Sequence, residues 1–294
     1  MSNPRFKVAA FGEILFDEFP AFRRIGGAPA NVACLCRQFG CEVALISAVG
    51  RDADGDELLS FLHERGVNAA FVGRSNYPTG RVEVKLDKAG KATYTIVENA
   101  AWDHIVCTDV LKSALPSFDV FVYGTLAQRS YSRAALIDCI RGLKKECIRF
   151  CDLNFRPPWD DPQLTRQSVE LATVLKLNDE ELPLLGHAFG VAPELATARV
   201  FAETPVRMVV VSCGSAGAEI HHPAGVSRRP AAKVAKLIDT VGAGDSFAAA
   251  TIAGLLRGDD FDRINDFANQ VAAYVCGVPG ATPELPARLT GAKR

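Results

Sequence analysis

The chain has 294 residues, of which 48% are hydrophobic and 23% are charged, and its formal net charge is −1. This composition is typical of a globular protein with a sizeable core, and the near-zero charge gives no reason to expect a nucleic-acid partner. The N-terminal stretch lacks the apolar core of a signal peptide, and no run of about 18 apolar residues occurs, so we expect no membrane partner.

The apolar runs alternate with amphipathic ones along the chain. Residues 7–15 and 42–50 have the pattern of buried strands, while 29–40 and 52–67 have helical periodicity. From residue 118 the alternation resumes, with strands expected at 118–124, 148–154, 174–178 and 206–214 and a helix at 240–258. This rhythm predicts a mainly parallel sheet with helices on both faces, in a single domain over residues 1–294.

Residues 70–98 have a different pattern, because 81–98 alternate apolar and polar residues around a D-K-A-G turn. This alternation predicts an antiparallel hairpin with one exposed face. Such a hairpin is marginal alone, so it either joins further strands as a lid or pairs with another subunit in a homodimer.

The nine cysteines are odd in number and contain no C-x-x-C pair, and apart from His221 and His222 the histidines are scattered. This usage predicts free, buried thiols in a reducing cytosol, hence a cytoplasmic protein. The usual spacing of a Cys and His metal site is missing.

The stretch DTVGAGDSFAAA, residues 239–250, places two glycines before a helix and a carboxylate, Asp245, just after them. The exposed amides and the dipole of a helix start favour an anion, so Gly242, Ala243 and Gly244 could hold a phosphate while Asp245 takes a proton from an attacking hydroxyl. The alternative is structural, with Asp245 or Ser246 acting as a helix cap. The motif is not a P-loop.

The stretch GGAPANVA, residues 26–33, puts two glycines and a proline ahead of the predicted first helix. Asn31 lies early in this helix, and Asp17 follows the first strand by a few residues. We expect both on loops at the carboxyl ends of strands, where open α/β sheets bind ligands. Their side chains suit sugar hydroxyls, although an ordinary turn with a helix-start asparagine has the same pattern.

Together, GGAPANVA and DTVGAGDSF resemble the two signatures of the ribokinase-like (phosphofructokinase B type) carbohydrate kinases, and GEILFDEFP, VYGTLAQRS, ENAAWDHI and DLNFRPPWD look most like the bacterial fructokinase branch. The resemblance implies a three-layer α/β/α fold with a mainly parallel central sheet and a small β lid. The lid strands should lie within 70–98, with a short contribution from 17–26. Only residues 18–25 separate Asp17 from Gly26, so the first lid strand should be short or absent.

The resemblance also implies the activity: transfer of the γ-phosphate of ATP to a sugar hydroxyl, with fructose as the expected acceptor. The acceptors left open are 2-keto-3-deoxygluconate, ribose and a nucleoside, and a non-catalytic sugar-binding protein is the alternative from another class. On the matching positions Asp245 is the general base, and the amides of Gly242, Ala243 and Gly244 form the anion hole.

The remaining matches assign further site residues. The acceptor would contact Asp17, Gly26, Gly27, Asn31, Arg81, Asn154 and Arg156. The nucleotide would contact Ser212, Gly214, Ser215, Gly217 and Asn269, and Asn178 with Glu181 would organise water-bound Mg²⁺. A K⁺ ion would be held by Asp239, Val241, Val275, Val278 and Gly280. Three alternatives remain. Arg81 could be a solvated surface charge, Arg156 could form a structural ion pair, and Glu180 could take the role assigned to Glu181.

Overall fold

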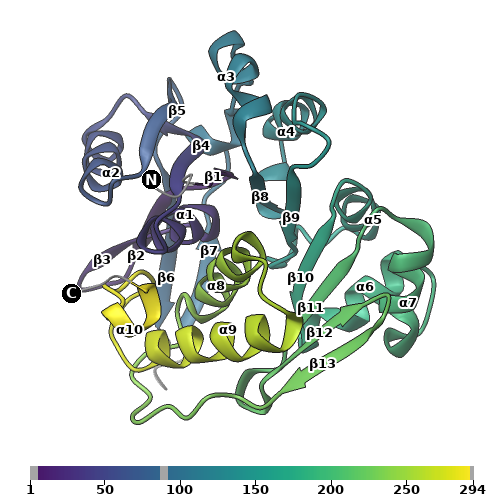
Figure 1. The fold of residues 1–294 in the computed structure, drawn as a ribbon. Helices are drawn as coiled ribbons and strands as arrows, with labels where there is room; N and C mark the ends of the chain where they lie inside the picture. The colour runs from purple at the N-terminus through teal and green to yellow at the C-terminus, as the bar shows by residue number, and fades with distance from the viewer. Residues whose placement is uncertain (1–5, 87–91, 292–294) are drawn as a thin grey trace, which may run out of the picture.

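The protein is described by a computed structural model that covers residues 6–86 and 92–291. Its main sheet has nine strands in the order β13-β12-β11-β10-β9-β8-β1-β4-β5 (Figure 1). Neighbouring strands pair in parallel along the run β11-β10-β9-β8-β1-β4-β5, and β12 and β13 add an antiparallel edge next to β11. Their bounds are β1 Lys7–Phe11, β4 Glu42–Gly50, β5 Asn68–Ser75, β8 Val120–Gly124, β9 Ile148–Asp152, β10 Val174–Asn178, β11 Met208–Ser212, β12 Ala218–His222 and β13 Gly225–Arg229.

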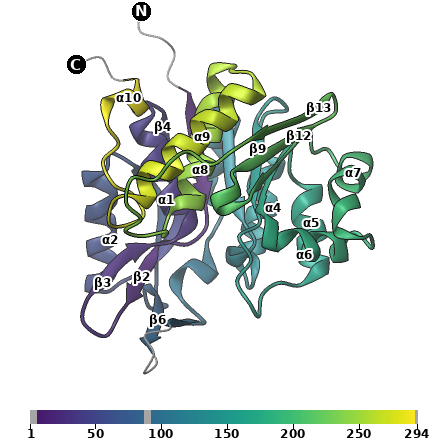
Figure 2. The ribbon, with the colours of Figure 1, turned by 90° about the horizontal axis from the view of Figure 1, so that it is seen from below.

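Helices cover both faces of this sheet, because successive side chains of a strand point to opposite faces. In β1, Val8 and Ala10 enter one core with α1, α2, α8 and α9, while Ala9 and Phe11 enter a second core with α3 to α7. Figure 2 shows these two helical layers on either side of the strands. The helices are α1 Ala28–Gln38, α2 Ala53–Glu64, α3 Asp109–Ala114, α4 Ser132–Arg141, α5 Pro162–Glu170, α6 Leu182–Ala188, α7 Pro193–Glu203, α8 Ala243–Arg257, α9 Phe261–Cys276 and α10 Ala287–Thr290.

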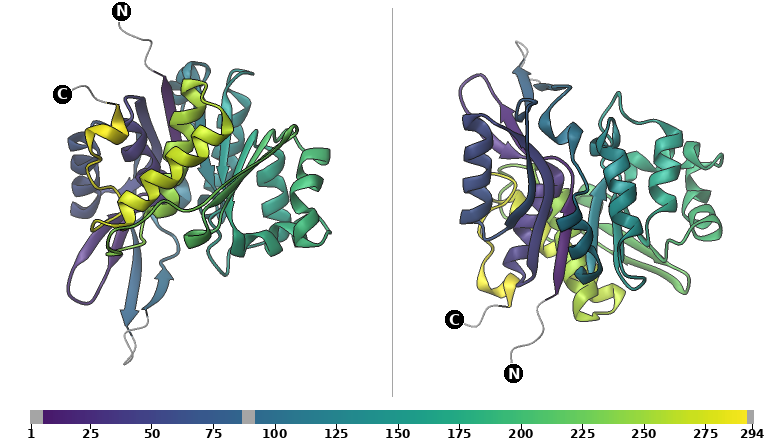
Figure 3. Two further views of the ribbon diagram at one scale, coloured as in Figure 1. Left: turned by 60° about the horizontal axis from the view of Figure 1, so that its bottom comes forward. Right: turned by 90° about the horizontal axis from the view of Figure 1, so that it is seen from above.

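A second, four-stranded sheet projects from the main body as a lid (Figure 3). Its order is β3-β2-β6-β7, with β2 antiparallel to β3 and parallel to β6. The predicted hairpin within 81–98 is confirmed as β6 and β7, and its D-K-A-G turn lies outside the described residues. The bounds are β2 Leu15–Glu18, β3 Arg23–Gly26, β6 Gly80–Leu86 and β7 Ala92–Ile96.

The structure bears on two expectations about this region. The first lid strand is short, as expected, since β2 and β3 form a hairpin of four residues on each side, but Asp17 lies within β2 rather than on a loop. Residues 70–75 belong to β5, an edge strand of the main sheet, so within 70–98 the lid strands begin only at Gly80. Among the described residues, no helix is both long and apolar enough to span a membrane.

Candidate active site

A cavity of about 1090 Å³ lies between the lid and the carboxyl ends of β1, β8 and β9. This is the edge at which an open α/β sheet binds ligands, because the loops and helix starts that follow parallel strands converge there. The first turns of α1 and α8 complete the wall. The predicted site residues that line the cavity are Asp17, Gly26, Gly27, Asn31, Asn154, Arg156, Val241, Gly242, Gly244, Asp245 and Gly280.

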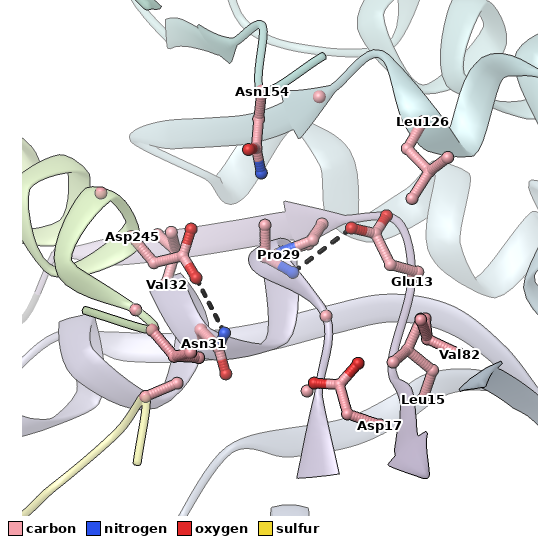
Figure 4. A pocket seen from close by; sticks show the side chains of 18 of the residues that line it. Glu13, Leu15, Asp17, Pro29, Asn31, Val32, Val82, Leu126, Asn154 and Asp245 are labelled. Carbon is pink, nitrogen blue, oxygen red and sulfur yellow. Dashed lines mark hydrogen bonds between the residues drawn. The ribbon is translucent and has the colours of Figure 1, made fainter. Parts of the chain in front are cut away.

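Asp245 lies in the first turn of α8 and faces the cavity (Figure 4). Its Oδ2 accepts a hydrogen bond from Asn31 Nδ2 at 2.8 Å. Burial raises the pKa of Asp245 to about 6, although the bond from Asn31 acts in the opposite direction. A carboxyl group with a pKa of about 6 is mostly ionised at neutral pH and is still basic enough to accept a proton.

Capping does not explain this carboxylate. The N-cap residue of α8 is Gly242, and no side chain caps it. Asp245 bonds instead to Asn31, and Ser246 Oγ donates to the carbonyl of Ala243.

The glycines before α8 shape the turn. Gly242 has a φ of 78°, and a Cβ there would lie 2.5 Å from Ala281 Cα, so a side chain is excluded on both grounds. Gly242 and Gly244 line the cavity. Ala243 does not, and its N–H donates to the carbonyl of Thr240 at 3.2 Å, within the turn itself.

The glycines before α1 allow two carboxylates to approach its first turn. A Cβ at Gly26 would lie 2.6 Å from Asp17 Oδ2, and Gly27, with a φ of 107°, lies against the carbonyl of Glu13. Glu13 Oε1 accepts from the N–H of Ala28 at 3.3 Å, as Figure 4 shows. Backbone and acids therefore pack too closely for any larger residue.

Glu13 is a cavity residue that the sequence reasoning did not find. Burial raises its pKa to about 7, and burial also raises the pKa of Asp17. The charge of Arg156 acts in the opposite direction on both acids and on Asp245. Arg156 is therefore the cation shared by three acids of the cavity.

Lys176 and Asp152 form a buried ion pair that was also missed. Lys176 Nζ donates to both carboxylate oxygens of Asp152 at 2.9 and 2.8 Å, and both side chains are less than a tenth exposed. Burial alone would lower the pKa of Lys176, but Asp152 keeps it above its ordinary value. The ammonium lies 3.6 Å from the position of a Cβ on Gly244, so its charge is next to the glycine turn.

Asn178 and Glu181 lie at the end of β10, outside the cavity lining. Asn178 Oδ1 accepts from the N–H of Glu181, and the carboxylate of Glu181 accepts from the N–H groups of Asn178 and Phe155 at 2.8 and 2.7 Å. Burial and the nearby Asp152 raise the pKa of Glu181. Glu180 is exposed, so the interior carboxylate is Glu181.

The predicted nucleotide residues lie one strand further along. Ser212 ends β11 directly opposite Asn178, and Gly214 and Ser215 lie in the 3₁₀ turn Gly214–Ala216 that follows. Gly217, with a φ of 105°, packs against the carbonyl of Arg229. Asn269 is buried in α9 and donates to Asn265, so its Nδ2 is occupied within the helix.

Two groups of predicted residues are arranged differently from their expected roles. Arg81 lies outside the cavity lining, with ion-pair distances of 3.6 Å to Glu18 and Asp54. Asp239, the expected K⁺ ligand, accepts from Arg24 Nη1 at 2.8 Å. The structure therefore brings a guanidinium, rather than a set of free oxygens, to Asp239.

The model of the pfkB family carbohydrate kinases matches residues 21–288. The chain belongs to this family. It is therefore an ATP-dependent sugar kinase, and both signature segments lie on the cavity described above. The ribokinase-like fold expected from the resemblance is confirmed.

Relatives within the pfkB family differ in acceptor. The chain is 29% identical to a fructokinase of Klebsiella pneumoniae, over 94% of this chain and 93% of that one. It is 24% identical to a 5-dehydro-2-deoxygluconokinase of Shouchella clausii, over 89% and 83%. The solved structure of a fructokinase with bound ATP from Xylella fastidiosa superposes with a TM-score of 0.86 at 21% identity, over 97% and 96% of the two chains.

The buried ion pair gives a stability prediction for this pfkB family member. Replacing Lys176 with Met leaves Asp152 buried without its partner and should lower the free energy of unfolding by about 3–5 kcal/mol, measured by urea denaturation. Lys144→Met is the matched control, because Lys144 pairs with Asp119 at 2.6 Å while both side chains are about a third exposed. It should cost less than about 1 kcal/mol. Equal losses in the two variants would contradict this assignment.

Proposed function

We propose that this kinase transfers the γ-phosphate of ATP to a hydroxyl of a neutral ketohexose, with fructose as the acceptor, and that Asp245 is the general base. The composition of the cavity supports this proposal most strongly. The cavity places Asp245, next to the glycine turn, in the same space as Asn31, Asn154, Asp17 and Glu13 (Figure 4). Amide and carboxyl side chains are the partners that sugar hydroxyls require.

The proposed step uses Asp245 as the proton acceptor. The attacking hydroxyl gives its proton to the carboxylate of Asp245 while its oxygen forms a bond to the γ-phosphorus. The bond between that phosphorus and the bridging oxygen of ATP breaks, and ADP leaves with the electron pair. Phosphoryl transfer needs positioning and charge neutralisation more than covalent help, so a preorganised base and an anion cradle are sufficient protein chemistry.

The negative charge of the transferring group would be met at the start of α8. Gly242 and Gly244 line the cavity where the N-terminal end of this helix favours an anion. Lys176, next to Gly244, offsets the negative charge of Asp152, which would otherwise oppose a phosphate near the glycine turn. Arg156 faces the same space and can neutralise phosphate through two N–H groups.

Magnesium fits the acids at the ends of β9 and β10. The negative charge of Asp152 contributes to the raised pKa of Glu181. Asp152 and Glu181 together therefore carry more negative charge than Lys176 neutralises. The two oxygens of Glu181 are held by backbone N–H groups, which suits contact with a hydrated ion through water. Asn178 and Glu181 would hold this ion, which would bind ATP phosphates and neutralise their charge.

The acids of the cavity favour a neutral acceptor over a sugar acid. Glu13 and Asp17 line it, and neither has an ion-pair partner closer than 4 Å within the part of the chain that the structure describes. A carboxylate on the acceptor would be repelled by Asp17 and by the ionised form of Glu13, whereas hydroxyls can donate to both side chains. The second candidate is 5-dehydro-2-deoxygluconate, named for one relative, and Arg156 is the residue that favours it.

Asp245→Asn tests the base. The substitution keeps the size of the side chain and removes the proton acceptor, so kcat should fall about 1000-fold while ATP and sugar still bind. Coupled ADP release gives the rate, and isothermal titration of the folded variant gives the affinities. Retention of more than a tenth of the wild-type kcat would show that another group takes the proton.

A panel of acceptors tests the substrate. Fructose should give the highest kcat/KM for ADP release, and sugar acids should be at least about 100-fold poorer, because a buried like charge is costly to approach. Glu13→Gln should narrow this gap about tenfold. Glu18→Gln removes the same charge outside the cavity lining and should leave the gap unchanged. A sugar acid preferred by the wild type would refute the neutral-acceptor proposal.

A further inference from the structure

Arg24, on lid strand β3, joins the lid to the DTVGAGDSF segment. Its Nη1 donates to Asp239 Oδ2 at 2.8 Å, between residues 215 apart in the chain. The guanidinium also lies 5.0 Å from the ring centre of Phe22 and 5.8 Å from that of Phe19. Asp239 is 17% exposed, so the ion pair is partly shielded from water.

Asp239 in turn holds the loop that leads into the glycine turn. Its Oδ1 accepts from the N–H of Val241 at 3.0 Å, and Oδ2 lies 3.5 Å from the N–H of Gly280. Burial opposes ionisation, but these bonds and Arg24 lower the pKa of Asp239 below its ordinary value. An ionised carboxylate in this place would repel the phosphates of ATP unless a cation stands beside it.

The side chains at this position do not fit a K⁺ ligand set. Both oxygens of Asp239 already face N–H donors, and the guanidinium of Arg24 would repel a second cation. The carbonyl of Val275, another expected ligand, accepts from the N–H of Val278. The positive charge beside Asp239 is therefore supplied by Arg24, a residue of the protein itself.

The position of Arg24 on the lid links this charge to the acceptor. Arg24 and Asp17 lie directly opposite each other on β3 and β2, and opposite residues of an antiparallel pair project from the same face. Both line the cavity. One face of the lid thus carries a residue suited to the sugar and the residue that holds the loop before the glycine turn.

We propose that Arg24 is a positioning residue whose guanidinium takes the place of a monovalent cation beside Asp239, so that phosphoryl transfer by this enzyme does not depend on K⁺. The inference rests on sugar-kinase activity but not on the identity of the acceptor. Any acceptor that gives turnover is sufficient for its test, so a failure of the fructose assignment is distinguishable from a failure here.

The experiment measures initial rates of ADP release by the full-length enzyme at constant ionic strength, while KCl replaces tetramethylammonium chloride stepwise. The wild-type kcat should change less than about twofold. Arg24→Ala should lose about 10- to 100-fold in kcat without K⁺, as expected for a displaced catalytic loop, and added K⁺ should restore most of it with saturation. Arg24→Lys should remain active without K⁺.

Arg23→Ala is the matched control. Arg23 is on the same strand and equally exposed, at 40%, but it pairs with Asp54 and Glu57 instead of Asp239. Its kcat and its response to K⁺ should match those of the wild type. Strong activation of the wild type by K⁺, an Arg24→Ala variant that behaves like Arg23→Ala, or a loss in Arg24→Ala that K⁺ leaves unchanged would each overturn the proposal.

Discussion

The hydrogen bond between Asn31 and Asp245 is the constraint on which the rest of the site depends. It joins the first turns of α1 and α8, which come from opposite ends of the chain and pack against the same face of the sheet. Because both helices start at glycines that tolerate no side chain, the bond fixes how the two signature segments meet. It also moderates the rise in the pKa of Asp245 that burial causes, so the carboxylate stays ionised at neutral pH.

Charges beside the cavity are arranged in pairs around this bond. Lys176 neutralises Asp152 beneath the glycine turn, and Arg24 neutralises Asp239 beside it. Glu13 and Asp17 stand apart: the charge of Arg156 acts on both, and that of Arg24 acts on Asp17 as well, without an ion pair in the described residues. A buried acid without a close partner is costly to the fold, and such groups persist where function requires them. This division separates an acceptor side whose acids lack an ion-pair partner in the described residues from a phosphate side where Asp152 and Asp239 are each paired with a cation.

Much of this arrangement could be predicted from the sequence. Residues 42–50 and 174–178 form strands with the expected bounds, because continuous apolar runs between turn signals leave little ambiguity. Asp245 and Asn31 could be found because glycines before a helix mark a close backbone approach. Lys176 could have been found as a charge within an apolar strand. Glu13 and Arg24 could not, since their contacts with Ala28 and Asp239 exist only in the folded chain. The expected lid region of 70–98 includes residues 70–75, which instead belong to β5 at the edge of the main sheet.

Burial raises the pKa of Asp245 towards neutrality, and a titration of its carboxyl carbon would measure that pKa. Protein labelled with ¹³C at aspartate carboxyl groups would be followed by NMR from acid to alkaline pH, with Asp245→Asn identifying the signal. We expect a pKa of about 6 for Asp245. A pKa near 4, the ordinary value of an exposed aspartate, would contradict it.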